Sequence, residues 1–156
     1  MKKALFFALS LIVSSPVFGQ EITQINLRLQ EIRNRDQSVR LNIAKSQQKG
    51  NIDSLIFYVE QMSKIDAENQ KYVDEIIPTK RIPDGLSRES YSAIFLVVDH
   101  ADIGYQKRHF KTLKQAAKEG KIEQSEISTL YDRIMMHSSR RQLFGTQTQS
   151  HTQIIE

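Results

Sequence analysis

The stretch Ala93-Ile94-Phe95-Leu96-Val97-Val98 decides the fold, because a helix with this sequence is apolar on every side. Such a helix is stable only when neighbouring elements bury all of its faces. Ser87, or alternatively Ser90, is expected to cap its N-terminus, and the helix is expected to reach about Asp102. The sequence therefore predicts a central buried helix surrounded by the rest of the chain.

The segments on both sides of this stretch also have helical patterns. Sustained period-two alternation is absent, and apolar residues recur in steps of three and four. Four further helices are expected at about Glu21–Gln48, Ile52–Ile77, Tyr105–Lys118 and Gln124–His137. The breaks between them fall at residues that interrupt helices: Gly50, Pro78, Gly104 and Gly120.

These patterns predict an all-α fold, a single helical bundle-like domain of four to five helices over residues 20–148. Residues 79–87 contain Pro83, Asp84 and Gly85 and are expected to form a loop before the central helix. Residues 149–156 are polar and without periodicity, so we expect them to form a flexible C-terminal tail.

Residues 1–19 have the order of features found in a secretory signal peptide. The basic start Met1-Lys2-Lys3 precedes an apolar stretch, Ala4 to Val13, that is shorter than a typical membrane span. Val17-Phe18-Gly19 then offers a cleavage site before Gln20. An uncleaved anchor and a buried N-terminal helix are the alternatives. Cleavage predicts an exported protein, periplasmic or secreted, with no stable membrane anchor.

The composition excludes several classes of protein. None of the 156 residues is a cysteine, which rules out a disulfide scaffold and Cys-ligated metal sites. Lys and Arg number 22 against 18 Asp and Glu, and loss of Lys2 and Lys3 with the signal leaves 20 against 18. So small an excess of positive charge argues against nucleic acid as a partner.

Polar residues interrupt the apolar rows of three predicted helices. Asp36 occupies one position of the row in the first helix, and Asp66 and Asn69 occupy two positions in the second. Gln106 begins the row of the helix predicted after Gly104. Because the apolar row of an amphipathic helix faces the core, these four side chains are expected to point into the protein.

The central helix ends in a further polar group, Asp99, His100 and Asp102. An unpaired buried carboxylate is costly, so these acids need partners. Arg40 lies one helical turn after Asp36, and Arg133 lies in the last predicted helix. Two interpretations stay open: a structural network of ion pairs and hydrogen bonds between helices, or a polar pocket that binds or transforms a ligand.

The chain also carries a series of short motifs in a fixed order. They are Arg35-Asp36-Gln37, Asp66 with Asn69, His100-Ala101-Asp102, Gln106, Asp132-Arg133 and Gln142-Leu143-Phe144-Gly145-Thr146-Gln147. This order resembles a bacterial family, domain-of-unknown-function family 6624, over about Leu29 to Gln147. The resemblance implies that these motifs form one site. It leaves the activity open, because the function of that family is not established.

Three departures from the family pattern bear on the site. Asp99 stands where the family usually has Gln, and Phe144 stands where it usually has Tyr. The loop before the central helix contains Pro78 to Pro83 in place of a Gly-Trp-Pro segment. In the closing motif we expect Phe144 to anchor in the core and Gly145 to permit a close backbone approach or a positive φ. The motif then forms a strap over the bundle, alone or also as a wall of the site.

The candidate ligand-binding residues are Asp36, Arg40, Asp66, Asn69, His100, Gln106, Arg133, Gln142 and Gln147. Their amides, carboxylates, guanidinium groups and imidazole suit a polar small molecule or a peptide, so a binding or interaction module is the expected function. The alternative is an exported hydrolase in which His100, with Asp36 or Asp102, acts as general acid and base. Neither a metal nor another cofactor is predicted, because the corresponding motifs are absent and nearby arginines would repel a cation.

Overall fold

The computed structural model describes residues 16–77, 80–139 and 141–147. In these ranges the protein contains five helices and no strand: α1 (Pro16–Gln48), α2 (Ile52–Ile76), α3 (Arg88–His100), α4 (Ile103–Lys118) and α5 (Gln124–Ser139). The predicted all-α fold of four to five helices is confirmed. Residues 1–15 of the predicted signal and the predicted tail, residues 149–156, lie outside the described residues.

Helix α1 begins at Pro16, so the predicted cleavage site between Gly19 and Gln20 lies about one turn after its start. Proline suits the first turn of a helix, because its missing N–H would have no acceptor there. In the described part of the chain, no helix is both long enough and apolar enough to cross a membrane.

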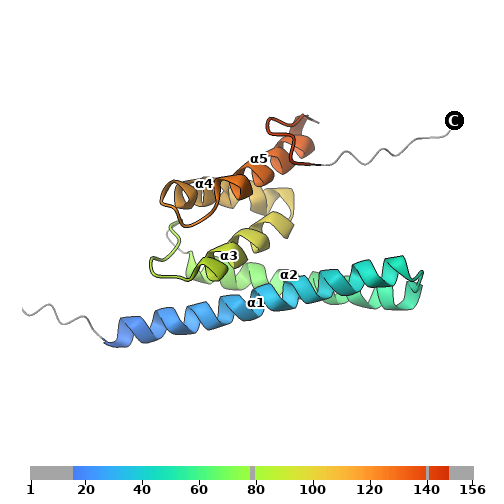
Figure 1. Ribbon diagram of the computed structural model, residues 1–156, viewed down its shortest axis with the longest axis horizontal. Helices are drawn as coiled ribbons and strands as arrows, with labels where there is room; N and C mark the ends of the chain where they lie inside the picture. Colours follow the sequence, from blue (N-terminus) through green and yellow to red (C-terminus); the bar gives the residue numbers. More distant parts are fainter. Residues whose placement is uncertain (1–15, 78–79, 140, 148–156) are drawn as a thin grey trace, which may run out of the picture.

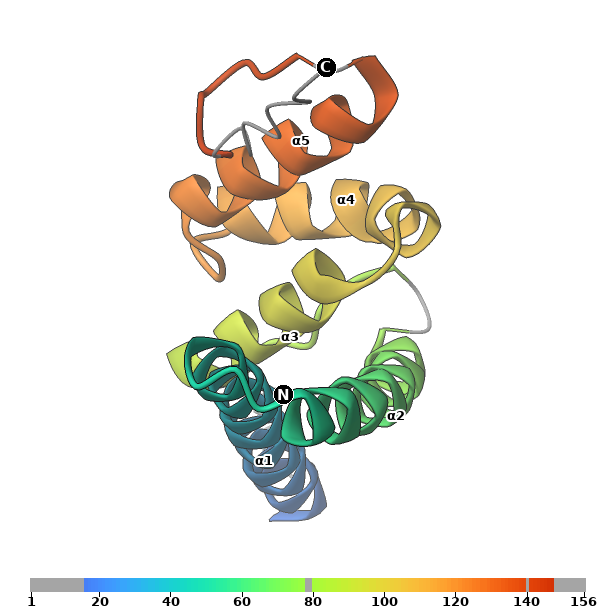
Figure 2. The same cartoon turned by 90° about the vertical axis from the view of Figure 1, so that its right-hand side faces the viewer.

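The helices are stacked in layers. α1 and α2 form a long antiparallel hairpin, and α3 lies across one face of it (Figure 1). α4 packs on α3, and α5 packs on α4, so each layer mainly contacts the next one (Figure 2). A single cluster of buried apolar residues connects the layers, from Leu29 and Ile32 of α1 to Ile127 and Leu130 of α5.

Helix α3 is the central buried helix that its sequence predicts. The side chains of Ala93, Ile94 and Val98 are fully buried, and only Leu96 within the apolar stretch is partly exposed. Ser87 is its N-cap, since the Ser87 side chain accepts a hydrogen bond from the backbone N–H of Ser90. Burial on all sides follows from its place between the α1–α2 hairpin and α4.

The far end of the hairpin extends beyond α3. Ile52 and Val59 belong to the apolar row of the predicted second helix, but they are 62% and 40% exposed, so in the first half of α2 this row does not face the core. The 13 residues of α3 are too few to cover the 25 residues of α2. Burial is complete only in the second half of α2, at Asn69 and Val73.

The turn between α3 and α4 lies earlier in the chain than predicted. α3 ends at His100, and Asp102 is the N-cap of α4, accepting hydrogen bonds from the N–H groups of Gly104 at 2.7 Å and Tyr105 at 3.1 Å. The predicted end of α3 at about Asp102 and the predicted start of α4 at about Tyr105 are therefore both slightly too late in the chain. A Cβ at Gly104 would lie 2.9 Å from Asp102 Oδ1, so glycine permits this tight cap.

Candidate functional site

Arg40 of α1 joins two carboxylates from different helices. Its Nε donates to Asp36 Oδ1 at 3.0 Å, one turn earlier in α1. Its Nη2 donates to both carboxylate oxygens of Asp66 in α2, at 2.9 and 3.1 Å. A guanidinium group suits this task, because its planar donors can serve several acceptors at once. The spacing of α1 alone predicted the first contact, whereas the second depends on how the hairpin closes.

His100, the last residue of α3, reaches the same carboxylate. His100 Nδ1 lies 3.1 Å from Asp36 Oδ1, and Gln37 Nε2 donates to Asp36 Oδ2 at 2.8 Å. Asp36 is only 2% exposed, but His100 is 18% and Arg40 is 26% exposed at the side chain. We call Asp36, Arg40, Asp66 and His100 the polar cluster. Its carboxylate centre is buried and its arginine and histidine reach the surface.

The two aspartates of the polar cluster have pKa values displaced in opposite directions. Burial alone would raise the pKa of Asp36, but the hydrogen bond and charge of His100, together with Arg40, hold it below its ordinary value. Burial raises the pKa of Asp66, and Arg40 opposes this shift without cancelling it. Neighbouring acids with separated pKa values are frequent at functional sites.

A second polar group surrounds the carbonyl end of α3. Arg133 of α5 donates from Nη1 to the backbone carbonyl of Asp99 at 3.1 Å, and its Nη2 lies 3.2 Å from Asp99 Oδ2. Gln106 Nε2 donates to the carbonyls of Asp99 and Ala101 at 2.9 and 3.0 Å. These contacts satisfy helix-end carbonyls and place a positive charge at the negative end of the helix dipole.

Four buried polar atoms, one each on α2, α3, α4 and α5, lack partners. Among the described residues, the buried side-chain atoms without a hydrogen-bond partner are Asn69 Nδ2, Asp99 Oδ1, Gln106 Oε1 and Arg133 Nε. Asn69 lies one turn after Asp66, and the carbonyl of the next residue, Gln70, accepts a hydrogen bond from Tyr105 of α4. Asp99, Gln106 and Arg133 meet at the end of α3. Buried polar groups are nearly always paired, so the three unpartnered atoms of these residues distinguish this region from the rest of the core.

The closing motif forms a strap, residues 142–147, that is held by one carboxylate of α5. Asp132 accepts hydrogen bonds from the backbone N–H groups of Leu143, Phe144 and Thr146 and from the Thr146 hydroxyl, at 2.8 to 3.1 Å. Burial would raise the pKa of Asp132, but these hydrogen bonds outweigh it and lower the pKa to about 2. The strap is therefore fastened by a charged acceptor.

The strap differs from the sequence-based expectation in one respect. Phe144 does not enter the core: its side chain is 56% exposed and packs edge-on against Tyr131, with 5.9 Å between ring centroids. Gly145 has the positive φ that was expected, at 70°. Gln142 and Gln147 bond to each other through side chain and backbone, at 2.7 and 2.8 Å.

Within the described residues, the side chains of three predicted site residues bond neither to the polar cluster nor to the group around the end of α3. Gln142 and Gln147 belong to the strap, where Gln147 also donates to the Thr129 carbonyl. Asp102 is exposed and caps α4. The strap is bonded to Asp132, and Arg133 is the next residue of α5. The connection of the two glutamines to the end of α3 is thus indirect.

The sequence analysis did not predict one polar pair, in which a buried histidine contacts an exposed aspartate. His109 Nε2 lies 3.0 Å from Asp74 Oδ1, and Tyr105 Oη donates to the same oxygen at 3.2 Å. Burial lowers the pKa of His109, and Asp74 opposes that shift. A second row of α4 with helical spacing, Tyr105, His109, Thr112 and Ala116, would have revealed the buried histidine. Its partner in α2 has no comparable signal.

A cation has no evident place in the polar cluster, because Arg40 already lies between Asp36 and Asp66. Across the described ranges, no three or more His, Asp or Glu side chains are arranged to hold a metal ion.

Every motif singled out in the sequence now has a structural place. Asp36, Asp66 and His100 belong to the polar cluster, and Gln37 donates to it, whereas Arg35 pairs with Glu68 at the surface. Asp132-Arg133 connects the strap with the end of α3. Residues 23–155 match a family of unknown function, DUF6624. The chain belongs to the DUF6624 family. Comparison of this DUF6624 domain with curated proteins and with solved structures gives no match.

Proposed function

We propose that the DUF6624 domain is an exported binding module that holds a polar small molecule or a peptide end beside the end of α3. The observation that carries this proposal is the set of four buried, unpartnered atoms on Asn69, Asp99, Gln106 and Arg133. Leaving a buried polar group unpaired is unfavourable, and such costs are tolerated mainly where a ligand provides the missing partner.

The chemistry of the four atoms defines the ligand. Asn69 Nδ2 and Arg133 Nε are donors, whereas Asp99 Oδ1 and Gln106 Oε1 are acceptors when Asp99 is ionised. A ligand with both N–H groups and carbonyl or carboxylate oxygens matches this set, and a peptide end has both. The neighbouring polar cluster contains both charge signs, which suits a zwitterion better than a simple anion or cation.

Entry of the ligand involves Arg133. The cavities described in the structure are lined by residues outside this region. The Arg133 side chain is 34% exposed and lies over Asp99. In this proposal Arg133 moves from Asp99 to the ligand carboxylate, while Asp99 accepts from the ligand ammonium group. Asp36, Arg40, Asp66 and His100 line the approach.

Titration of the labelled protein with triglycine, followed by nuclear magnetic resonance, tests this function. We expect saturable shifts of the side-chain amide signals of Asn69 and Gln106 and of the Arg133 Nε–H signal. Asn51 is the internal control, because its side chain is exposed and caps α2 at the far end of the hairpin, away from the proposed site. Unchanged Asn69 and Gln106 signals at millimolar triglycine would contradict the peptide-binding proposal.

The contact between His100 and Asp36 favours a second candidate function, a hydrolase. A carboxylate that binds Nδ1 orients the imidazole and favours the tautomer whose Nε2 can accept a proton from an attacking water. Ester hydrolysis should then be lost in His100→Asn, whose amide can still bond to Asp36, and retained in His137→Asn, at an exposed histidine of α5. Equal rates in both variants would exclude this candidate.

Export is the remaining part of the proposal. It is supported by the order of features in residues 1–19 and by the start of the family match at residue 23, after the expected cleavage site.

A further inference from the structure

A groove beside α4 concentrates positive charge. It has a volume of about 550 Å³ and is lined by Lys80, Arg108, Lys111, Lys114 and Lys118 together with two neutral polar residues. We call this the basic groove. It lies outside the polar cluster and contains no carboxylate in its lining, although the whole chain has nearly as many acids as bases.

The cations of the basic groove are not neutralised by the protein. In the part of the chain that the structure describes, none of the five takes part in an ion pair. Nearby carboxylates are engaged elsewhere: Asp74 binds His109 and Tyr105, and Glu119 binds Lys121. No ion pair among the described residues therefore offsets the repulsion between these like charges.

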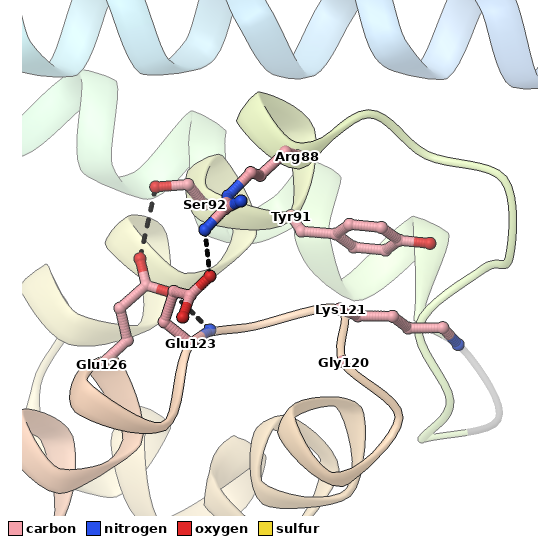
Figure 3. Close-up of a pocket in the computed structure, with 7 residues that line it drawn as sticks. All are labelled: Arg88, Tyr91, Ser92, Gly120, Lys121, Glu123 and Glu126. Atoms are coloured by element: carbon pink, nitrogen blue, oxygen red, sulfur yellow. Dashed lines mark hydrogen bonds and ion pairs between the residues drawn. The ribbon is translucent and has the colours of Figure 1, made fainter.

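A second cavity shows the opposite arrangement. Between the start of α3 and the turn before α5, Arg88 pairs with Glu123, and Ser92 donates to Glu126 (Figure 3). Lys121, which also lines this cavity, pairs with Asp84 and Glu119. The charged side chains of this second cavity are thus paired within the protein. Of the two sites, the basic groove is the one whose charges have no partner in the described residues and would attract an external anion.

The backbone brings Lys80 to the basic groove in an unfavourable conformation. Lys80 has φ of 58°, and among the described residues it is the one non-glycine residue with positive φ. Residues other than glycine rarely adopt this left-handed backbone conformation, and such backbone strain is concentrated at binding sites. At Lys80 this backbone strain occurs where the lysine lies beside four cations of α4. The electrostatic repulsion between these charges is a second unfavourable term at the same place.

The side chain of Arg108 is held in place by an aromatic ring. Its guanidinium group lies over the ring of Tyr105, 4.8 Å from the centroid. The Tyr105 hydroxyl is itself fixed by hydrogen bonds to the Gln70 carbonyl and to Asp74. Stacking reduces the conformational freedom of the arginine, and a planar guanidinium group matches the oxygens of a phosphate group.

We propose that the basic groove binds a compact anion with at least two phosphate groups. The distance along α4 from Arg108 to Lys118 is about 15 Å, which exceeds the reach of a single phosphate. The volume falls in the range of small-molecule sites. A membrane surface is disfavoured as the partner because the lining of the basic groove lacks apolar residues. Single-stranded nucleic acid is disfavoured because no aromatic residue lines the groove for base stacking.

Calorimetric titration of the full chain with inorganic tripolyphosphate, at near-physiological salt and without divalent cations, tests the proposal. The double variant Lys111→Gln/Lys114→Gln should bind about tenfold more weakly or worse. The matched control Lys64→Gln/Lys71→Gln removes the same charge from exposed sites on α2 and should bind like the parent. Orthophosphate should bind more weakly than tripolyphosphate, because it contacts fewer cations.

Lys80→Gly separates binding from stability. Glycine accepts positive φ, so this variant should unfold at the same or a higher temperature and yet bind tripolyphosphate more weakly. Equal weakening in the groove and control double variants would overturn the proposal, as would orthophosphate binding as tight as tripolyphosphate. Binding of anionic vesicles or of DNA without binding of tripolyphosphate would also overturn it and would assign the groove to those partners.

Discussion

Nδ1 of His100 lies 3.1 Å from Oδ1 of Asp36, although 64 positions separate the two residues in the chain. The same oxygen accepts a hydrogen bond from Arg40, which also binds Asp66. One buried carboxylate thus links α1 to both α2 and α3. The three helices meet at a charged contact as well as at their apolar faces, and its disruption affects all three.

Replacement of Asp36 by alanine should destabilise the fold by about 2–4 kcal/mol, because Arg40, Gln37 and His100 lose their common acceptor. Urea unfolding measures the change. Glu31→Ala is the control: its pair with Arg28 is exposed, so the loss should stay below about 1 kcal/mol. Similar losses in the two variants would show that the polar cluster contributes no more than a surface pair.

Asn69 and Asn26 should respond in opposite directions to replacement by leucine. Asn69 Nδ2 is buried and unpaired, so Asn69→Leu should leave stability unchanged or raise it by up to about 1 kcal/mol. Asn26 Oδ1 accepts the Ser87 N–H at 2.8 Å, so Asn26→Leu should cost about 1–3 kcal/mol. Calorimetric unfolding compares the two. A destabilised Asn69→Leu variant would mean that the native fold satisfies this amide.

The strap should loosen in acid. The pKa of Asp132 is lowered to about 2 in the folded protein, below the ordinary value of about 3.9. The stabilisation by ionised Asp132 is therefore complete at a pH above its ordinary pKa, and it is lost as the pH falls through the pKa of the folded protein. Amide signals of Leu143, Phe144 and Thr146 should move toward unfolded positions between about pH 4 and 2.

Asp132→Asn provides the control for this pH dependence. The variant lacks the charged acceptor, so its strap signals should already be displaced at neutral pH and should change little in acid. A parent strap that stays intact below pH 2, or a variant that titrates like the parent, would assign the transition to other groups. Asp36, with its lowered pKa, contributes in the same direction but is reported by signals in α1.

Removal of the signal should leave Gln20 or a close neighbour as the first residue. The reason is the small residue Gly19 after a basic start and an apolar stretch. Expression in a bacterium, followed by intact-mass measurement of the exported fraction, checks the cleavage site. Chains that begin at Met1 in that fraction would refute it. A Gly19→Arg variant should accumulate uncleaved and serves as the negative control.

Local pattern was sufficient for the helices. Apolar spacing predicted all five segments, and Ser87 was correctly expected to cap α3, because periodicity and capping act within a few residues. Local pattern was insufficient at the turn after α3, where Asp102 caps the next helix. It also failed at Ile52 and Val59, because a helix row shows which face is apolar without showing how far a neighbour extends.

The polar residues of the candidate site were recognisable from the sequence as interruptions of apolar rows, at Asp36, Asp66, Asn69 and Gln106. The sequence did not show that the site residues divide into two groups, the polar cluster and the group around the end of α3. Arg40 meets Asp66 because the hairpin closes, and Arg133 meets Asp99 because α5 is placed on α4 and reaches the end of α3. Such contacts are fixed when the helices dock, since periodicity determines a side chain's direction but only packing determines what lies opposite it.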